Sequence, residues 1–199
     1  AGGDMTKVNG DSIFPVLNML NAKYFILPLQ DGQTVPVQNP YVYGNAWFVD
    51  QVHYVDNANA ELDMVGTLNL RHEAVADNRF SSVVGQSVEQ DSTSIVTITS
   101  YDANRLTYDV SSAKGGVIVF SEVYYPGWTA TVDGKEVPVG RVNYILRAIR
   151  VEPGNHKVEL AFFPKSVDTT ETIAYAAYAV LLIVIVTMAV RRRKSGRVV

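Results

Sequence analysis

An uninterrupted apolar run near the C-terminus constrains this chain more than any other feature. The 18 residues from Ile173 to Val190 include no charged residue, no proline and no glycine. At about 1.5 Å rise per residue they would span roughly 27 Å, close to the hydrocarbon core of a bilayer. The run is apolar all round rather than along one stripe, which disfavours a core helix of a soluble protein. We therefore predict a transmembrane helix over residues 173–190.

Charged residues are distributed unevenly around this run. Five of the 17 basic residues follow it directly, whereas all 20 acidic residues lie before residue 172. These basic residues are Arg191, Arg192, Arg193, Lys194 and Arg197. Because basic residues concentrate on the cytoplasmic side of a membrane, we expect residues 191–199 to form a basic cytoplasmic tail and the N-terminal body to be extracytoplasmic.

The composition disfavours several classes of function. Before the tail, 12 basic residues stand against 20 acidic ones, so we expect no nucleic-acid partner, since phosphate contacts need clustered Lys and Arg. The absence of cysteine excludes disulfides and thiolate metal sites. The three histidines are scattered, and HExxH, GxSxG, P-loop and GxGxxG motifs are absent. We therefore expect no metal and no cofactor, and a self-contained hydrolase is the weakest hypothesis.

Residues 1–90 predict a small α+β extracytoplasmic segment, because short apolar runs alternate with turn-forming residues. Ser12 would cap a first helix, and Asn57 or Asn59 would cap a second one. The expected elements are a helix over residues 12–21, strands over residues 24–29 and 46–54, and a helix that follows Asn57 or Asn59 and runs through residues 61–68.

Residues 91–166 predict a β-sandwich. At least seven short runs rich in β-branched residues follow one another at regular spacing, and Asp133-Gly134 is typical of a two-residue hairpin turn. The expected strands cover residues 95–101, 105–110, 116–123, 128–132, 135–139, 143–151 and 156–163. The predicted fold is mainly β with minor α: an immunoglobulin-like or jelly-roll β-sandwich, preceded by the α+β segment and followed by one transmembrane helix.

A cluster of polar and aromatic residues is the main candidate for ligand contact. Its members are Glu122, Tyr124, Tyr125, Trp128 and Arg147. Aromatic rings can stack on a sugar while a carboxylate binds its hydroxyls. The alternative, which we favour, is structural: Trp128 fills the sandwich core and Glu122 pairs with Arg141 or Arg147. No residue is assigned a catalytic role.

Residues 120–165 carry a distinctive series of short motifs, and residues 17–24 and 45–49 add two more. The series is Ser121-Glu122, Tyr124-Tyr125-Pro126-Gly127-Trp128, Val132-Asp133-Gly134-Lys135, Asn143-Tyr144, Leu146-Arg147, Pro153-Gly154-Asn155-His156 and Phe163-Pro164-Lys165. With these motifs the chain resembles the C-terminal region of the YfhO-like bacterial membrane protein family.

This resemblance implies a polytopic protein similar to GT-C-type glycosyltransferases, which transfer a sugar from a polyprenyl-phosphate donor outside the membrane. In such enzymes the catalytic acid lies between early transmembrane helices, so we expect this chain to be a fragment without the catalytic centre. The expected location is the bacterial inner membrane. The expected partners are the lipid bilayer, upstream transmembrane helices of the same protein, and a glycan or polyprenyl-phosphate sugar. The alternative is a non-enzymatic, membrane-anchored module that binds a glycan or a protein or acts as a scaffold.

Overall fold

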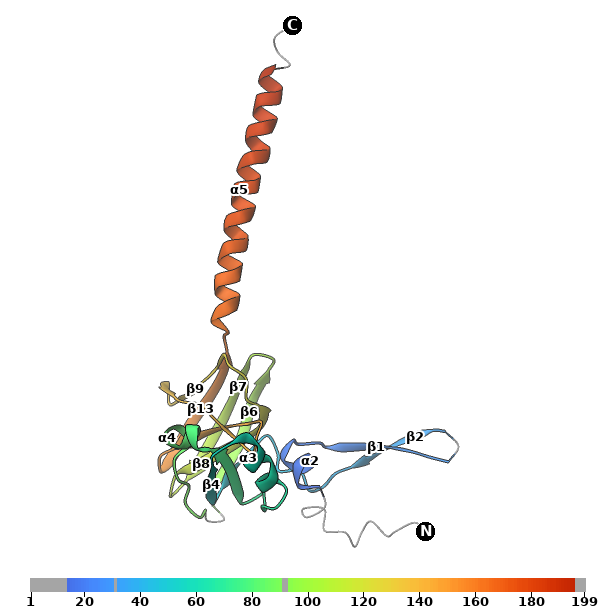
Figure 1. Ribbon diagram of the computed structural model, residues 1–199, viewed down its shortest axis with the longest axis vertical. Helices are drawn as coiled ribbons and strands as arrows, with labels where there is room; N and C mark the ends of the chain where they lie inside the picture. The colour runs from blue at the N-terminus through green and yellow to red at the C-terminus, as the bar shows by residue number, and fades with distance from the viewer. Residues whose placement is uncertain (1–13, 31, 91–92, 196–199) are drawn as a thin grey trace. The chain divides into compact units, whose positions relative to one another are not determined.

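The computed structural model describes residues 14–30, 32–90 and 93–195, and these residues form two compact units (Figure 1). The first unit ends at Phe162 and is mainly β. The second unit begins at Phe163 and contains the long C-terminal helix. The predicted fold class, mainly β with minor α and one C-terminal apolar helix, is confirmed.

The first unit is built around two antiparallel sheets that face each other as a sandwich. A five-stranded sheet has the order β10-β9-β13-β7-β6, and a four-stranded sheet has the order β11-β12-β8-β3. The strands are β3 (Ala46–Val49), β6 (Ile95–Asp102), β7 (Arg105–Ser112), β8 (Gly116–Val123), β9 (Trp128–Val132), β10 (Lys135–Val137), β11 (Gly140–Val142), β12 (Leu146–Val151) and β13 (Gly154–Phe162).

Strand β8 shows how the sequence pattern produces two hydrophobic cores. Successive side chains of a strand point to opposite faces. Ile118 and Phe120 lie in the core between the two sheets, whereas Val117 and Val119 lie in a second core on the other face. Because β8 is buried on both faces, it reads as a continuous apolar run rather than an alternating one.

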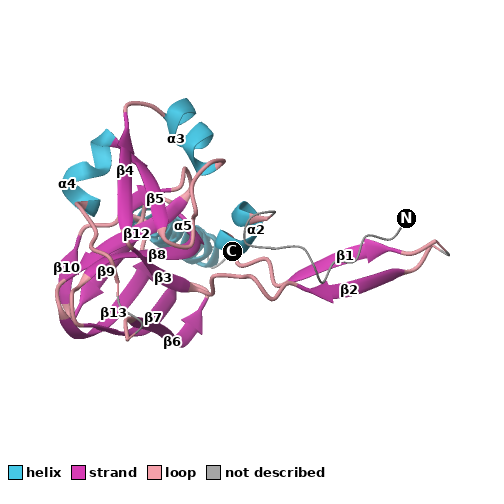
Figure 2. Ribbon diagram, turned by 90° about the horizontal axis from the view of Figure 1, so that it is seen from below, coloured by secondary structure: helices cyan, strands magenta, loops and turns pink. Residues whose placement is uncertain are grey.

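The second core lies on the outer face of the four-stranded sheet. There β4 (Gln51–Val55) and β5 (Glu73–Asp77) form a parallel pair that packs with α3 (Ala58–Val65), as Figure 2 shows. Asn57 caps α3, because its side chain accepts a hydrogen bond from the Ala60 N–H at 3.0 Å. Asn57 is thus the capping residue of the two that the sequence offered.

The four-stranded sheet contains strands from both sides of the expected boundary between residues 90 and 91. Strand β3 pairs with β8, so a segment from the first 90 residues completes the sandwich. The single strand expected over residues 46–54 is two strands in different sheets, with Asp50 between them. The cause is a long-range contact: the N–H groups of Asp50 and Gln51 both donate to the carbonyl oxygen of His72.

Two turns, at residues 133–134 and 143–144, lie next to strands that carry residues of the candidate site. Asp133 and Gly134 have φ of 52° and 79°, as the predicted type I′ hairpin requires. The strand expected over residues 143–151 begins only at Leu146. Asn143 and Tyr144 instead adopt left-handed conformations with φ of 49° and 72°, and thereby form a tight corner between β11 and β12.

After β5 the chain forms the 3-10 turn η2 (Asn78–Phe80) and the short helix α4 (Ser81–Val84). The helix expected over residues 12–21 is the shorter α2 (Pro15–Met19), and its proposed cap Ser12 lies outside the described residues. Strands β1 (Tyr24–Pro28) and β2 (Thr34–Gln38) then form a separate two-stranded hairpin.

The second unit consists of α5, which extends over Lys165–Ser195 (Figure 1). Within it, Thr170–Ala189 is long and apolar enough to cross a membrane, and its side chains are unburied. This stretch overlaps the predicted span over residues 173–190. The helix continues through Ser195, so the first residues of the predicted tail are helical.

Candidate functional site

The candidate site is organised around an ion pair between Arg147 and Glu122. Arg147 lies on β12 and Glu122 on β8, which are neighbours in the four-stranded sheet. By strand alternation, Glu122 follows Ile118 and Phe120 on the face of β8 directed toward the other sheet. The Arg147 Nη2 donates to Glu122 Oε2, and the Arg147 side chain is only 1% exposed against 21% for Glu122.

Trp128 connects this ion pair to the opposite sheet. It is the first residue of β9, and the Arg147 guanidinium carbon lies over its ring at 3.9 Å from the centroid. A cation over an indole face is attracted by the ring's electron density, most strongly where water is excluded. Phe162 also packs on Trp128, with ring centroids 5.3 Å apart. Arg147 therefore interacts with both sheets.

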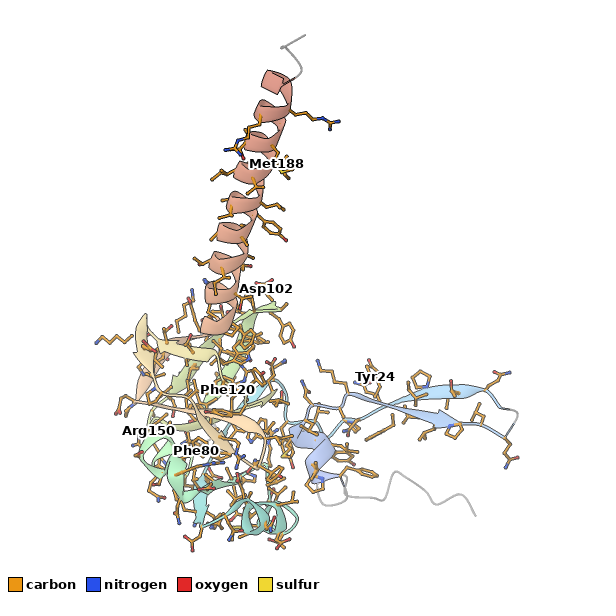
Figure 3. The ribbon with its side chains drawn as sticks, turned by 45° about the horizontal axis from the view of Figure 1, so that its top comes forward. Tyr24, Phe80, Asp102, Phe120, Arg150 and Met188 are labelled. Carbon is orange, nitrogen blue, oxygen red and sulfur yellow. The ribbon has the colours of Figure 1, made fainter. Side chains whose placement is uncertain are left out.

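Several polar atoms around the ion pair are buried without a hydrogen-bond partner among the described residues. They are Glu122 Oε1, Arg147 Nε, Arg147 Nη1 and the Tyr108 hydroxyl. Tyr108 belongs to β7 and packs edge-on against Phe120 (labelled in Figure 3), with ring centroids 5.1 Å apart. Each unpaired buried polar group costs about 1–3 kcal/mol, so these atoms have unused capacity for a polar ligand.

The ionisation of the groups follows from burial and from the Glu122 charge. Burial lowers the pKa of Arg147, and the Glu122 carboxylate opposes that effect. Burial raises the pKa of Tyr108. The charge of Glu122 raises the pKa of Tyr101, an exposed residue of β6, with smaller contributions from burial and from a side-chain hydrogen bond to the Glu122 carboxylate. Both phenols are therefore neutral hydrogen-bond donors at physiological pH.

The structure brings together three of the five predicted site residues: Glu122, Trp128 and Arg147. Tyr124 is directed elsewhere, since its ring packs against Phe80 at 5.7 Å between centroids. Tyr125 is 61% exposed and lies beside Phe162, at 6.1 Å between ring centroids.

Of the two partners considered for Glu122, the structure selects Arg147. Arg141 instead pairs with Glu61, at 2.6 Å between Nη2 and Oε2.

Trp128 is only partly buried and borders the inter-sheet core. Trp47, in contrast, is almost fully buried, and its Nε1 donates to the Leu70 carbonyl at 3.2 Å.

Tyr101 and Tyr108 were not predicted as members of the site. Tyr108 could have been identified from the sequence, because strand alternation puts it on the same apolar face as Leu106 and Val110. A phenol on such a face needs a partner for its hydroxyl. For Tyr101 no local signal existed, because its proximity to Glu122 depends on how the two sheets face each other.

A second buried network, also unpredicted, is centred on Glu61. Its side chain is fully buried on α3 and accepts both Arg141 Nη2 and the backbone N–H of Tyr144, the latter at 2.9 Å. Next to it, the Asn143 Oδ1 accepts the Val75 N–H at 3.0 Å, and the Asn143 N–H donates to the Val75 carbonyl at 2.7 Å. These bonds fix the left-handed corner between β11 and β12 onto α3 and β5.

Metal ligation is not evident in the described part of the chain: no group of three or more His, Asp or Glu residues there is arranged to hold an ion. The network around Glu61 also contains two buried donors without a hydrogen-bond partner among the described residues, Arg141 Nε and Asn143 Nδ2, but both carboxylate oxygens of Glu61 are paired, so it leaves no acceptor free. The ion pair of Arg147 and Glu122, with its unpaired polar atoms, is therefore the stronger candidate for ligand contact.

Comparison with known proteins agrees with the resemblance carried by the sequence motifs. Residues 63–174, more than half of the chain, match the family described as bacterial membrane protein YfhO. The matched range contains Glu122, Trp128 and Arg147, and it extends into α5. No curated protein and no solved structure matches the chain significantly. This chain belongs to the YfhO family of bacterial membrane proteins.

Proposed function

We propose that this chain is the extracytoplasmic accessory domain and last membrane helix of a polytopic envelope protein that resembles lipid-linked-sugar glycosyltransferases. The observation that carries the proposal is the exposed apolar surface of α5 over Thr170–Ala189, which is unburied on every side. Such a surface is stable in lipid and costly in water. The family match supports the same environment.

The orientation follows from charge. Exposed Arg191 and Arg192 directly follow the apolar stretch, and basic flanks are retained in the cytoplasm. The sandwich, at the other end of α5 in sequence, is then extracytoplasmic. Its role is to cover or shape the outer mouth of the membrane domain, and the reaction centre is formed by other parts of the protein.

The absence of cysteine permits a direct test of this topology. One variant carries Asp102→Cys on the exposed end of β6, and the other carries a single cysteine added after Val199. In intact spheroplasts, a membrane-impermeant maleimide should label the first variant and label the second only after permeabilisation. Labelling of the added cysteine in intact spheroplasts would contradict the proposed orientation.

A second candidate function, binding of a neutral sugar by the sandwich, is favoured by the unpaired atoms beside Arg147. Glu122 neutralises Arg147, so the site has no net charge to attract an anion. It holds a buried acceptor at Glu122 Oε1 and buried donors at Arg147 Nε and Nη1, so the surrounding side chains must move for a ligand to reach them. An alcohol hydroxyl both donates and accepts, and therefore satisfies both kinds of group.

The aromatic contribution to such a site comes from rings other than Trp128. One face of Trp128 is already covered by the Arg147 guanidinium and cannot stack on a sugar. Tyr101 and Tyr125 are 64% and 61% exposed, and the charge of Glu122 raises the pKa of the Tyr101 phenol. These two rings are the available surfaces for the apolar face of a sugar.

Binding of neutral oligosaccharides to the full chain in detergent tests this second candidate. Glu122→Gln and Tyr101→Ala should each weaken binding severalfold, whereas Glu159→Gln on β13, which removes an exposed carboxylate, should leave it unchanged. Trp128→Ala should also weaken binding, because Arg147 loses the ring that positions it. Equal binding by all variants would show that these residues do not contribute to a sugar site. The topology proposal would be unaffected.

A further inference from the structure

The β1–β2 hairpin presents an apolar face that no other part of the described chain covers. The register pairs Phe25 with Val37 and Leu27 with Val35, so these four side chains share one face. Leu27, Val35 and Val37 are each between 37% and 44% exposed. At the base of the hairpin, Phe14 packs on Phe25 with ring centroids 5.4 Å apart. Beyond that contact the face is open.

An uncovered hairpin of this kind is poorly stable in water. A two-stranded sheet alone buries too little apolar surface to be independently stable, and it needs a third strand or a packing surface. Figure 2 shows β1 and β2 paired only with each other, and the described chain supplies no third strand to this sheet. The apolar face therefore requires a covering surface from outside the described residues.

Lipid is the covering surface that fits the hairpin best. Residues 24–38 contain a single charged residue, Asp31, so a charge-paired protein interface is not indicated. Addition of a strand from a partner is disfavoured, because Pro28 and Pro36 interrupt the donors along the edges. A bilayer is also the environment that the family and α5 establish for this chain.

The opposite face of the hairpin has the composition expected at a membrane–water boundary. This face is mixed: the polar residues Tyr24, Thr34 and Gln38 lie on it together with Ile26, Pro28 and Pro36, and Tyr24 (labelled in Figure 3) and Ile26 are 63% and 72% exposed. Lys23 precedes the first strand and is exposed. Tyrosine and lysine are typical of the headgroup region, where water can also satisfy the open strand edges.

We propose that the β1–β2 hairpin lies flat on the surface of a lipid bilayer, with the face formed by Phe25, Leu27, Val35 and Val37 in contact with the acyl chains. The contact resembles that of an interfacial amphipathic element: the wholly apolar face enters the boundary region, and the mixed face with Tyr24, Thr34 and Gln38 is directed toward water. The hairpin thereby forms a second membrane contact, separate from α5.

Single-cysteine labelling of the full chain tests this contact, since the natural chain has no cysteine. Leu27→Cys carries the environment-sensitive dye NBD on the apolar face, and Thr34→Cys carries it on the opposite face as a matched control. The protein is reconstituted into vesicles of phosphatidylethanolamine and phosphatidylglycerol. We expect the NBD at Leu27→Cys to emit at shorter wavelength and to be quenched by doxyl-labelled lipids, and the NBD at Thr34→Cys to show neither effect.

Val184→Cys in α5 serves as the positive control, because its side chain lies within the apolar stretch. NBD at Leu27→Cys that reports water, with quenching intact at Val184→Cys, would overturn the proposal. NBD that emits at short wavelength but is not quenched by the labelled lipids would overturn it too, and would assign the apolar face to a protein partner. Val35→Cys, which lies across the hairpin from Leu27, should repeat the result obtained at Leu27.

Discussion

The guanidinium of Arg147 lies 3.9 Å from the centre of the Trp128 ring, although the two residues belong to different sheets of the sandwich. The same guanidinium pairs with Glu122 on the neighbouring strand. One buried cation thus depends on a carboxylate from its own sheet and an indole from the other. Removal of either partner leaves the charge in an environment that cannot solvate it.

We expect Glu122→Gln to destabilise the sandwich by about 3 kcal/mol, because the variant leaves the buried Arg147 without a counter-charge. The Glu122 side chain is 21% exposed, so water moderates the loss but does not remove it. Urea unfolding in mild detergent, followed by the fluorescence of Trp47 and Trp128, measures the change in free energy of unfolding.

The matched control is the double variant Glu122→Gln/Arg147→Met, which removes both charges and retains a long side chain. Its loss of stability should be clearly smaller than the sum of the two single losses, since contacting residues couple. Strictly additive losses would mean that the two side chains do not stabilise each other in the folded protein.

We expect Glu61→Gln to cost more than the loss of an exposed ion pair. Glu61 is fully buried and compensates Arg141, whose side chain is 17% exposed, so its neutralisation should cost about 3 kcal/mol. Glu159→Gln breaks the exposed pair with Lys157 and should change the free energy of unfolding by less than about 1 kcal/mol. The same urea titration compares both variants. Equal losses would contradict the structural role assigned to Glu61.

The sequence predicted the features that depend on local patterns. Hydropathy located the candidate membrane helix, alternation located most sandwich strands, and Asp133-Gly134 located a hairpin. It did not predict that β3 joins β8, or that Glu61 pairs with Arg141, which is 80 positions away. Such pairings depend on which surfaces meet after folding, and residue patterns within a short window contain no information about them.

The same limit applies to the candidate site. The association of an acidic residue with nearby aromatics indicated Glu122 and Trp128, but Tyr124 was included only because it is adjacent in sequence. In the structure its ring packs against Phe80, away from the ion pair. Sequence proximity is a poor guide here, because neighbouring residues in a turn are directed to different surfaces.

We expect Asn143→Ala to destabilise the protein by about 2–3 kcal/mol. Asn143 is fully buried at φ 49°, and its side chain accepts the N–H of Val75. Alanine removes that acceptor and tolerates the left-handed conformation less well than asparagine. Asn143→Gly relieves the backbone strain but also lacks the acceptor, so its loss should be smaller than that of alanine. If both variants have the same urea midpoint of unfolding as the wild type, the hydrogen bond to Val75 contributes little to stability.

The pair of His156 and Asp133 should make stability depend on pH. The two side chains are 2.7 Å apart, and their hydrogen bond raises the pKa of His156 above its usual 6.5 and lowers the pKa of Asp133 below its usual 3.8. The His156 contribution is complete below pH 6.5 and is lost as the pH rises through the raised value. The Asp133 contribution is complete above pH 3.8 and is lost as the pH falls through the lowered value.

The pair should therefore stabilise the sandwich most between these two pH values. We expect the difference in free energy of unfolding between wild type and His156→Gln to be larger at about pH 5.5 than at about pH 8.5. Asp133→Asn should abolish the same pH dependence, because it removes the acceptor that holds the imidazolium. An NMR titration of His156 provides an independent check: a pKa at or below the usual histidine value would refute the assigned contact, whatever the unfolding data show.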